Sequence, residues 1–191
     1  MNPKVILPGV FLAVLFLMSS VSVRNLIFKM NLIIFFQEAP YVKLTNVVCE
    51  SKNKSWAVFH YCRLKAYSRN KTSLNINATF LHPANNVTLK LKMVKKLSGY
   101  KPFLFDVTID ACLFMRKRHN PVIKMFYSFI KDYSTINHTC PYEGLQMVSD
   151  YHTAVFPVPL PTGDYGVLLD FIFDGKKQFH VNVYFTFVED F

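Results

Sequence analysis

Glycine is scarce in this sequence, with six residues among 191. A glycine-rich phosphate loop is therefore not expected, and no P-loop, G-x-S-x-G or H-E-x-x-H motif is present. Charged residues make up only 18% of the chain against 51% hydrophobic residues, which excludes a disordered protein. Acidic residues are also few, 12 against 22 basic ones, and the resulting charge of +10 favours an acidic partner such as nucleic acid, anionic lipid or sulfated glycan.

Aromatic residues are abundant, with nineteen Phe and ten Tyr, and they favour β-strands. Apolar and polar residues alternate with period two in about seven segments, which predicts an antiparallel β-sandwich. The expected strands cover residues 41–49, 55–65, 73–80, 87–93, 103–111, 165–173 and 178–188. We expect the first two strands to form a pair and the third and fourth to lie side by side with one solvated face. Asp174-Gly175 predicts a hairpin between the last two.

One segment has helical rather than strand periodicity. Apolar residues in Val122–Tyr133 recur at helical spacing, Asn120 can cap the helix, and Pro121 fits its first turn. One short helix is therefore expected between strands. The whole sandwich domain is predicted over residues 41–191.

Residues 1–22 have the three parts of a secretory signal peptide. Lys4 supplies the positive charge, Val5–Met18 is a 14-residue apolar run, and Ser20-Val21-Ser22 places small residues before the cleavage site. A membrane span needs about 20 apolar residues, so a cleaved signal and no stable span are predicted. A second apolar stretch within residues 23–40 has three interpretations: an extra edge strand, a tail, or an artefact of how the coding region was assembled.

Five N-x-[ST] sequons also indicate the secretory pathway. The 13 Asn and 21 Ser plus Thr residues would give about 1.4 sequons by chance. The predicted glycosylation sites are Asn53, Asn70, Asn77, Asn86 and Asn137. A secreted location makes nucleic acid an unexpected partner.

The four cysteines are even in number and lie outside the leader, as disulfides in an oxidising compartment require. Of three possible pairings, Cys49–Cys62 and Cys112–Cys140 are favoured. Zinc is the rival interpretation, because His60 and His138 each precede a cysteine by two residues. The chain has no C-x₂-C pair, so no metal site or other cofactor is expected.

No set of residues predicts catalysis, and the protein is expected not to be an enzyme. Asp106 and Asp110 would lie about 13 Å apart on one strand, beyond the usual separation of glycosidase carboxylates. Ser149, Asp150 and His152 are triad residue types, but near neighbours in one loop seldom adopt triad geometry. The basic cluster at residues 116–119 is interpreted as a solvated turn, a headgroup or glycan contact, or a processing site.

The concentration of phenylalanines in a few strands has two interpretations. They fill an ordinary core, or they line an apolar cavity between two sheets that do not close fully. In the second case strand alternation selects seven candidate ligand contacts: Phe103, Phe105, Val107, Phe171, Phe173, Val183 and Phe185.

Five ordered segments resemble a large insect family of secreted proteins with a domain of unknown function. They are Leu44-Thr-Asn-Val47 with Cys49-Glu-Ser51, Val58-Phe-His-Tyr-Cys62, Phe105–Cys112, Asn137–Tyr142 and Leu160–Tyr165. This family is similar to ML lipid-recognition domains and to ganglioside-activator-like chemosensory proteins. The resemblance implies an immunoglobulin-like sandwich that holds a lipid or pheromone-like molecule. The alternative is an interaction module with a filled core, which binds a cell-surface receptor or matrix component through its basic surface.

Overall fold

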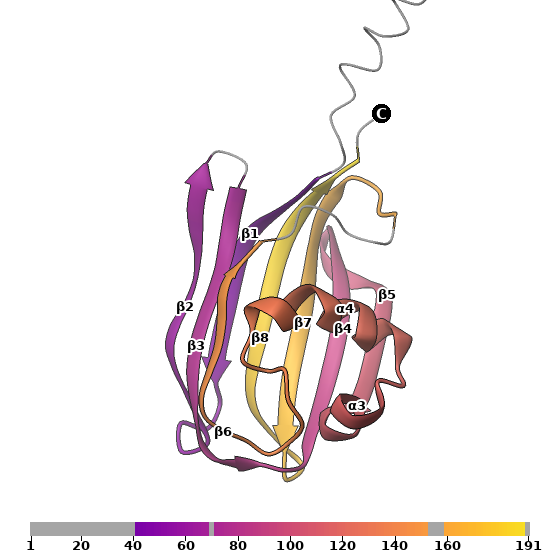
Figure 1. The fold of residues 1–191 in the computed structure, drawn as a ribbon. Helices are drawn as coiled ribbons and strands as arrows, with labels where there is room; N and C mark the ends of the chain where they lie inside the picture. The colour runs from indigo at the N-terminus through magenta and orange to yellow at the C-terminus, as the bar shows by residue number, and fades with distance from the viewer. Residues whose placement is uncertain (1–40, 69–70, 153–158, 190–191) are drawn as a thin grey trace, which may run out of the picture. The chain divides into compact units, whose positions relative to one another are not determined.

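The computed structural model describes residues 41–68, 71–152 and 159–189, which form an antiparallel β-sandwich of two sheets (Figure 1). The predicted sandwich is therefore confirmed. The predicted signal peptide, the stretch 23–40, Asn70 and the last two residues lie outside the described residues.

The larger sheet has five strands in the order β1-β8-β7-β4-β5, and every neighbouring pair is antiparallel. Its strands are β1 (Tyr41–Ser51), β8 (Lys176–Val188), β7 (Gly163–Phe173), β4 (Val87–Leu97) and β5 (Gly99–Asp110). The predicted β7–β8 hairpin is confirmed. Asp174 and Gly175 both have positive φ, 50° and 71°, as a tight hairpin turn requires.

The smaller sheet has three strands in the order β2-β3-β6. They are β2 (Ala57–Ser68), β3 (Lys71–Ala84) and β6 (Tyr142–Tyr151). β6 raises the strand count from about seven to eight. Its inward positions include the polar Gln146, whereas Leu145 points outward and is 51% exposed, so hydrophobic alternation does not reveal this strand.

Two expected strand pairings are wrong. β1 pairs with β8 and β2 with β3, so that the first two strands belong to different sheets. The chain crosses between the sheets again after β3, because Ala84 pairs with Tyr142 whereas Val87 pairs with Phe173. β3 and β4 consequently do not share one solvated face. Sequence alternation identifies the strands but does not specify which strand each one pairs with.

A helical segment follows β5 and lies over one face of the larger sheet (Figure 1). α4 (Pro121–Ile130) confirms the predicted helix, and the Asn120 side chain accepts a hydrogen bond from the Ile123 amide at 3.0 Å. A 3₁₀ turn, η1 (Lys131–Tyr133), continues it. A second helix, α3 (Ala111–Lys117), occupies residues that include the end of an expected strand. Asp110 caps α3 by accepting from the Leu113 amide at 2.8 Å.

Both disulfides join the predicted cysteines. Cys49–Cys62 connects β1 of the larger sheet to β2 of the smaller one. Cys112–Cys140 connects α3 to the residues just before β6. The second bridge therefore fixes the two ends of the helical segment against each other.

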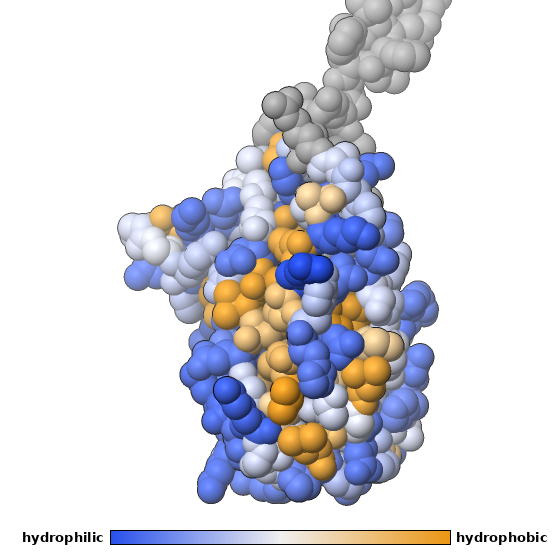
Figure 2. Space-filling view, turned by 90° about the vertical axis from the view of Figure 1, so that its left-hand side faces the viewer, coloured by the Kyte–Doolittle hydropathy of each residue, from blue (hydrophilic) through white to orange (hydrophobic). Residues whose placement is uncertain are grey.

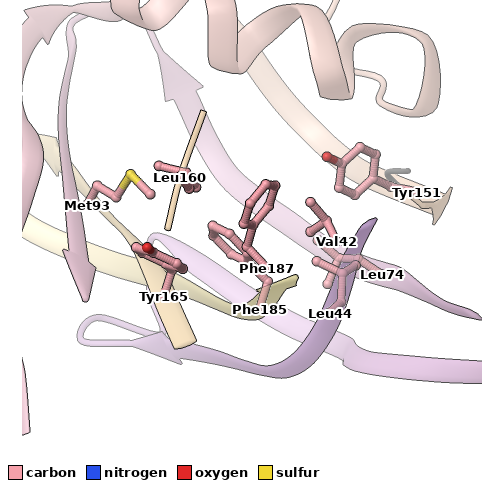
Figure 3. Close-up of a cluster of buried hydrophobic side chains, with 9 residues drawn as sticks. All are labelled: Val42, Leu44, Leu74, Met93, Tyr151, Leu160, Tyr165, Phe185 and Phe187. Carbon is pink, nitrogen blue, oxygen red and sulfur yellow. The ribbon is translucent and has the colours of Figure 1, made fainter. Parts of the chain in front are cut away.

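Side chains from both sheets close one end of the sandwich, near the start of β1 and the end of β8. Figure 3 shows this cluster, whose members come from β1, β3, β4, β6, β7, β8 and the loop before β7. It consists of Val42, Leu44, Leu74, Met93, Tyr151, Leu160, Tyr165, Phe185 and Phe187. The Tyr165 hydroxyl donates to the Pro161 carbonyl, and the Tyr142 hydroxyl likewise donates to the His138 carbonyl. Each bond anchors the start of a strand to the loop before it, as a tyrosine corner does.

The side of the molecule at the left of Figure 1 is not uniformly polar. Figure 2 shows hydrophobic side chains in the middle of this face, with hydrophilic residues around them. In the smaller sheet, Leu81 and Leu145 are 48% and 51% exposed. Isolated exposed leucines of this kind are normal on protein surfaces and do not by themselves define a site.

Candidate functional site

An apolar cavity of about 260 Å³ lies among the two sheets and the helical segment. Its volume approaches the ~300 Å³ at which small-molecule sites begin, and exceeds the ~150 Å³ of an engineered cavity that binds benzene. The smaller sheet has only three strands, so the helices, rather than a second complete sheet, cover the rest of the larger one. This incomplete sheet pairing explains why the interior is not filled.

The sheets supply inward-facing residues to the cavity wall. In β3, β4, β7 and β8 the residues that face inward and line the cavity occupy every second position. The wall residues of these four strands are Leu74, Ile76, Ala78, Phe80, Val87, Leu89, Leu91, Val167, Leu169, Phe171, Phe173, Phe179, Val181, Val183 and Phe185.

The helices supply a second group of wall residues. They are Ala111, Phe114 and Met115 of α3 and Ile123, Phe126, Tyr127, Phe129 and Ile130 of α4. Phe114, Met115 and Ile123 pack with Leu91 and Ile109 of the larger sheet in one buried cluster. This cluster holds both helices against the sheet, so they form a wall of the cavity.

Four lining residues carry a polar group: Tyr127, Tyr142, Gln146 and Tyr151. The Gln146 amide is occupied within the protein, since its Nε2 donates to the Glu143 carbonyl at 3.0 Å and its Oε1 accepts from Thr135 at 3.2 Å. The Tyr142 hydroxyl is also occupied, by the His138 carbonyl. No charged side chain lines the cavity within the described ranges. The cavity therefore offers a ligand almost only apolar contact.

Burial raises the pKa of Tyr142 to about 12, and the nearby Tyr127 adds to this effect, while Arg118 opposes it. A raised pKa favours the neutral phenol, which is consequently the form present in the folded protein at neutral pH. The cavity wall is thus uncharged at this position.

Four of the seven predicted ligand contacts line the cavity: Phe171, Phe173, Val183 and Phe185. The other three, Phe103, Phe105 and Val107, lie on the same face of β5 but outside the cavity lining. Phe103 packs on the ring of Tyr165, with 5.5 Å between centroids, and Phe105 packs on Phe126 at 5.9 Å. On this strand Ile109 lines the cavity instead.

The helix residues and the β3 residues of the wall were not selected from the sequence as ligand contacts. The helical spacing of Phe126, Phe129 and Ile130 marks an apolar face, but periodicity does not show what that face packs against. In the structure this side of the helix packs against the larger sheet, where Ile123 contacts the cluster that includes Leu91 and Ile109.

The candidate catalytic residues of the sequence have other roles in the fold. Asp106 forms an ion pair with Lys92 at 2.9 Å, and Asp110 caps α3. The Asp150 carboxylate accepts hydrogen bonds from Tyr67 and Ser73, whereas His152 Nδ1 lies 2.9 Å from the Asp150 backbone carbonyl. The carboxylate therefore does not orient the imidazole as a triad requires.

The histidines weighed for zinc are also engaged elsewhere. His60 Nε2 lies 2.9 Å from Thr79 Oγ1, and His138 Nδ1 lies 2.7 Å from the Thr139 carbonyl. All four cysteines form disulfides. Among the described residues no group of three or more His, Cys, Asp or Glu side chains could hold a metal ion.

The described sequons differ in exposure. Asn86 and Asn137 are exposed, and Asn53 is half-buried with its Oδ1 bonded to Ser55. Asn77 is also half-buried, but its Oδ1 is buried and has no hydrogen-bond partner among the described residues. The four described asparagines therefore differ in exposure, although all four match the sequon pattern equally.

Together these features define a disulfide-linked antiparallel β-sandwich with an apolar cavity. A family model described as "Protein of unknown function (DUF1091)" matches residues 89–167. The match covers less than half of the chain and runs from β4 through both helices and β6 into β7. A search of curated proteins found no match.

Proposed function

We propose that this protein is a secreted, non-enzymatic carrier that binds a hydrophobic small molecule or lipid in the cavity. The observation that supports this most directly is the lining, in which apolar side chains from both sheets and both helices surround about 260 Å³. Since burial of apolar surface contributes about 25 cal/mol per Å², such a wall favours a hydrocarbon ligand over a polar one. The resemblance of the sequence to a family similar to ML lipid-recognition and ganglioside-activator-like proteins would imply the same ligand class.

Three features support secretion. The chain has two disulfides, which persist in oxidising compartments. It also has five sequons and an N-terminal segment with the pattern of a signal peptide. No helix within the described ranges is long and apolar enough to cross a membrane.

The test is the uptake of a neutral fluorescent probe, N-phenyl-1-naphthylamine, by protein secreted from eukaryotic cells. Val183→Trp places a large side chain in the cavity wall and should weaken probe binding at least about ten-fold. Val48→Trp is the matched control, because Val48 is 39% exposed on the outer face of the same sheet. This variant should bind like the wild type.

Two results would contradict the proposal. Wild-type protein that takes up no probe and carries no lipid in native mass spectrometry would favour the alternative, an interaction module acting through its basic surface. Equal loss of binding in Val183→Trp and Val48→Trp would place the probe outside the cavity.

A further inference from the structure

Arg118 lies directly against the aromatic wall of the cavity. It ends α3 in the left-handed region, with φ 50° and ψ 34°, and its amide donates to the Phe114 carbonyl at 2.7 Å. This backbone conformation turns the chain so that the guanidinium stacks on two rings. Its Cζ lies 4.1 Å from the ring centroid of Tyr127 and 5.4 Å from that of Phe114. Both rings line the cavity.

The guanidinium of Arg118 retains N–H donors that bind no other described residue. Among the described residues it forms no ion pair with a carboxylate, and its side-chain hydrogen bond to the neutral Tyr127 hydroxyl is long, 3.4 Å. By contrast, Lys92 and Lys177 on the larger sheet pair with Asp106 and Asp170 at 2.9 and 2.6 Å. Arg118 is also half-buried, whereas Arg116 and Lys117 on the same helix are exposed.

The positive charge of Arg118 acts on the cavity wall. It lowers the pKa of Tyr142, a lining residue, against the larger opposing effect of burial. Electrostatic attraction is stronger in such partly desolvated surroundings than in water. An anion placed beside Tyr127 would therefore be stabilised more than one at an exposed lysine.

We infer that Arg118 is the headgroup site of the carrier, and that the ligand is a single-chain amphiphile whose anionic head pairs with Arg118 while its hydrocarbon tail fills the cavity. This inference rests on the proposed function. A guanidinium offers a planar fork that binds a carboxylate or phosphate through two parallel hydrogen bonds. Stacking on Tyr127 and Phe114 orients the guanidinium before the ligand binds, which lowers the entropy lost on binding.

The experiment measures displacement of the neutral probe by three ligands with one chain length: dodecanoate, dodecyl phosphate and uncharged dodecanol. Wild-type protein should bind an anionic ligand about ten-fold or more tightly than dodecanol. Arg118→Gln should abolish this preference, so that the anionic ligands bind no more tightly than dodecanol. Arg116→Gln removes the same charge from an exposed site on the same helix and should keep the preference.

Binding of dodecanol by the wild type distinguishes failure of the headgroup site from failure of the proposed function. If the wild type binds none of the three ligands, the proposed function itself fails. If it binds dodecanol and the anions equally, or if Arg118→Gln keeps the preference, the headgroup site is wrong. Equal loss in Arg116→Gln would assign the preference to the overall positive charge and also overturn the site. Within a confirmed site, the tighter of the two anions identifies the head as carboxylate or phosphate.

Discussion

Gly166 of β7 is the described glycine at which an added Cβ atom would meet the closest neighbours. A Cβ atom at this position would lie 2.9 Å from Cδ1 of Tyr184 and 3.0 Å from Cγ2 of Val94. Tyr184 in turn packs on Tyr100, with 5.2 Å between ring centroids, so the ring is confined on the outer face of the larger sheet. The absence of a side chain at Gly166 is what allows this aromatic layer to lie close to the strand.

We predict that Gly166→Ala lowers the free energy of unfolding by about 1–3 kcal/mol, because the added methyl group overpacks this contact. Urea unfolding measures the loss. In a double-mutant cycle the cost should fall when Tyr184 is also changed to Ser, since the closest neighbour is then gone. An additive cycle would show that the ring of Tyr184 does not cause the loss.

At the scale of elements, the helical segment completes the cavity, and a disulfide joins its two ends to each other. α4 begins with a capped turn at Asn120, and Ile123 buries its apolar side. Seven other wall residues come from α3 and the rest of α4 on each side of that contact. The Cys112–Cys140 bridge closes a loop that contains both helices and η1. Without this bridge the segment would be held by side-chain packing and backbone hydrogen bonds.

We predict that Cys112→Ser with Cys140→Ser lowers the free energy of unfolding by about 3.6 kcal/mol, the chain-entropy value for a loop of this length. Secretion should fall severely, and probe binding should weaken in any protein recovered. Ser128→Ala, on the exposed face of α4, is the control and should change stability by no more than about 0.5 kcal/mol. Near-normal yield of the double variant would contradict a structural role for the bridge.

For the molecule as a whole, the fold determines which parts of the surface can carry glycans. The cross-strand neighbours of Asn77 are Tyr61 and Met147, at the centre of the smaller sheet. Asn86 and Asn137, in contrast, lie in exposed connections outside the strands. A glycan on either would point away from the sheets.

We predict that peptide mapping of the secreted protein finds glycans at Asn86 and Asn137 and an unmodified Asn77. Asn77→Gln should then leave the electrophoretic mass unchanged, whereas Asn137→Gln should reduce it by one glycan. Occupied Asn77 with bare Asn86 and Asn137 would refute this assignment. Unmodified asparagines throughout would instead argue against secretion.

The sequence by itself determined the features that depend on neighbouring residues. Asn120-Pro121 specifies the start of α4 and Asp174-Gly175 the β7–β8 turn, because caps and tight turns depend on local backbone chemistry. Period-two alternation located seven of the eight strands, and β6 was missed because its buried Gln146 satisfies its amide within the protein.

Only the tertiary structure decided which strands pair, where the chain crosses between sheets, and what the helices cover. Strand pairing depends on contacts between residues far apart in the sequence, so alternation allowed β3 and β4 to be neighbours although they belong to different sheets. The same reason explains the cavity. Phe103 and Phe185 both occupy alternating apolar positions of a strand, yet Phe185 lines the cavity, whereas Phe103 packs on the ring of Tyr165 outside the lining.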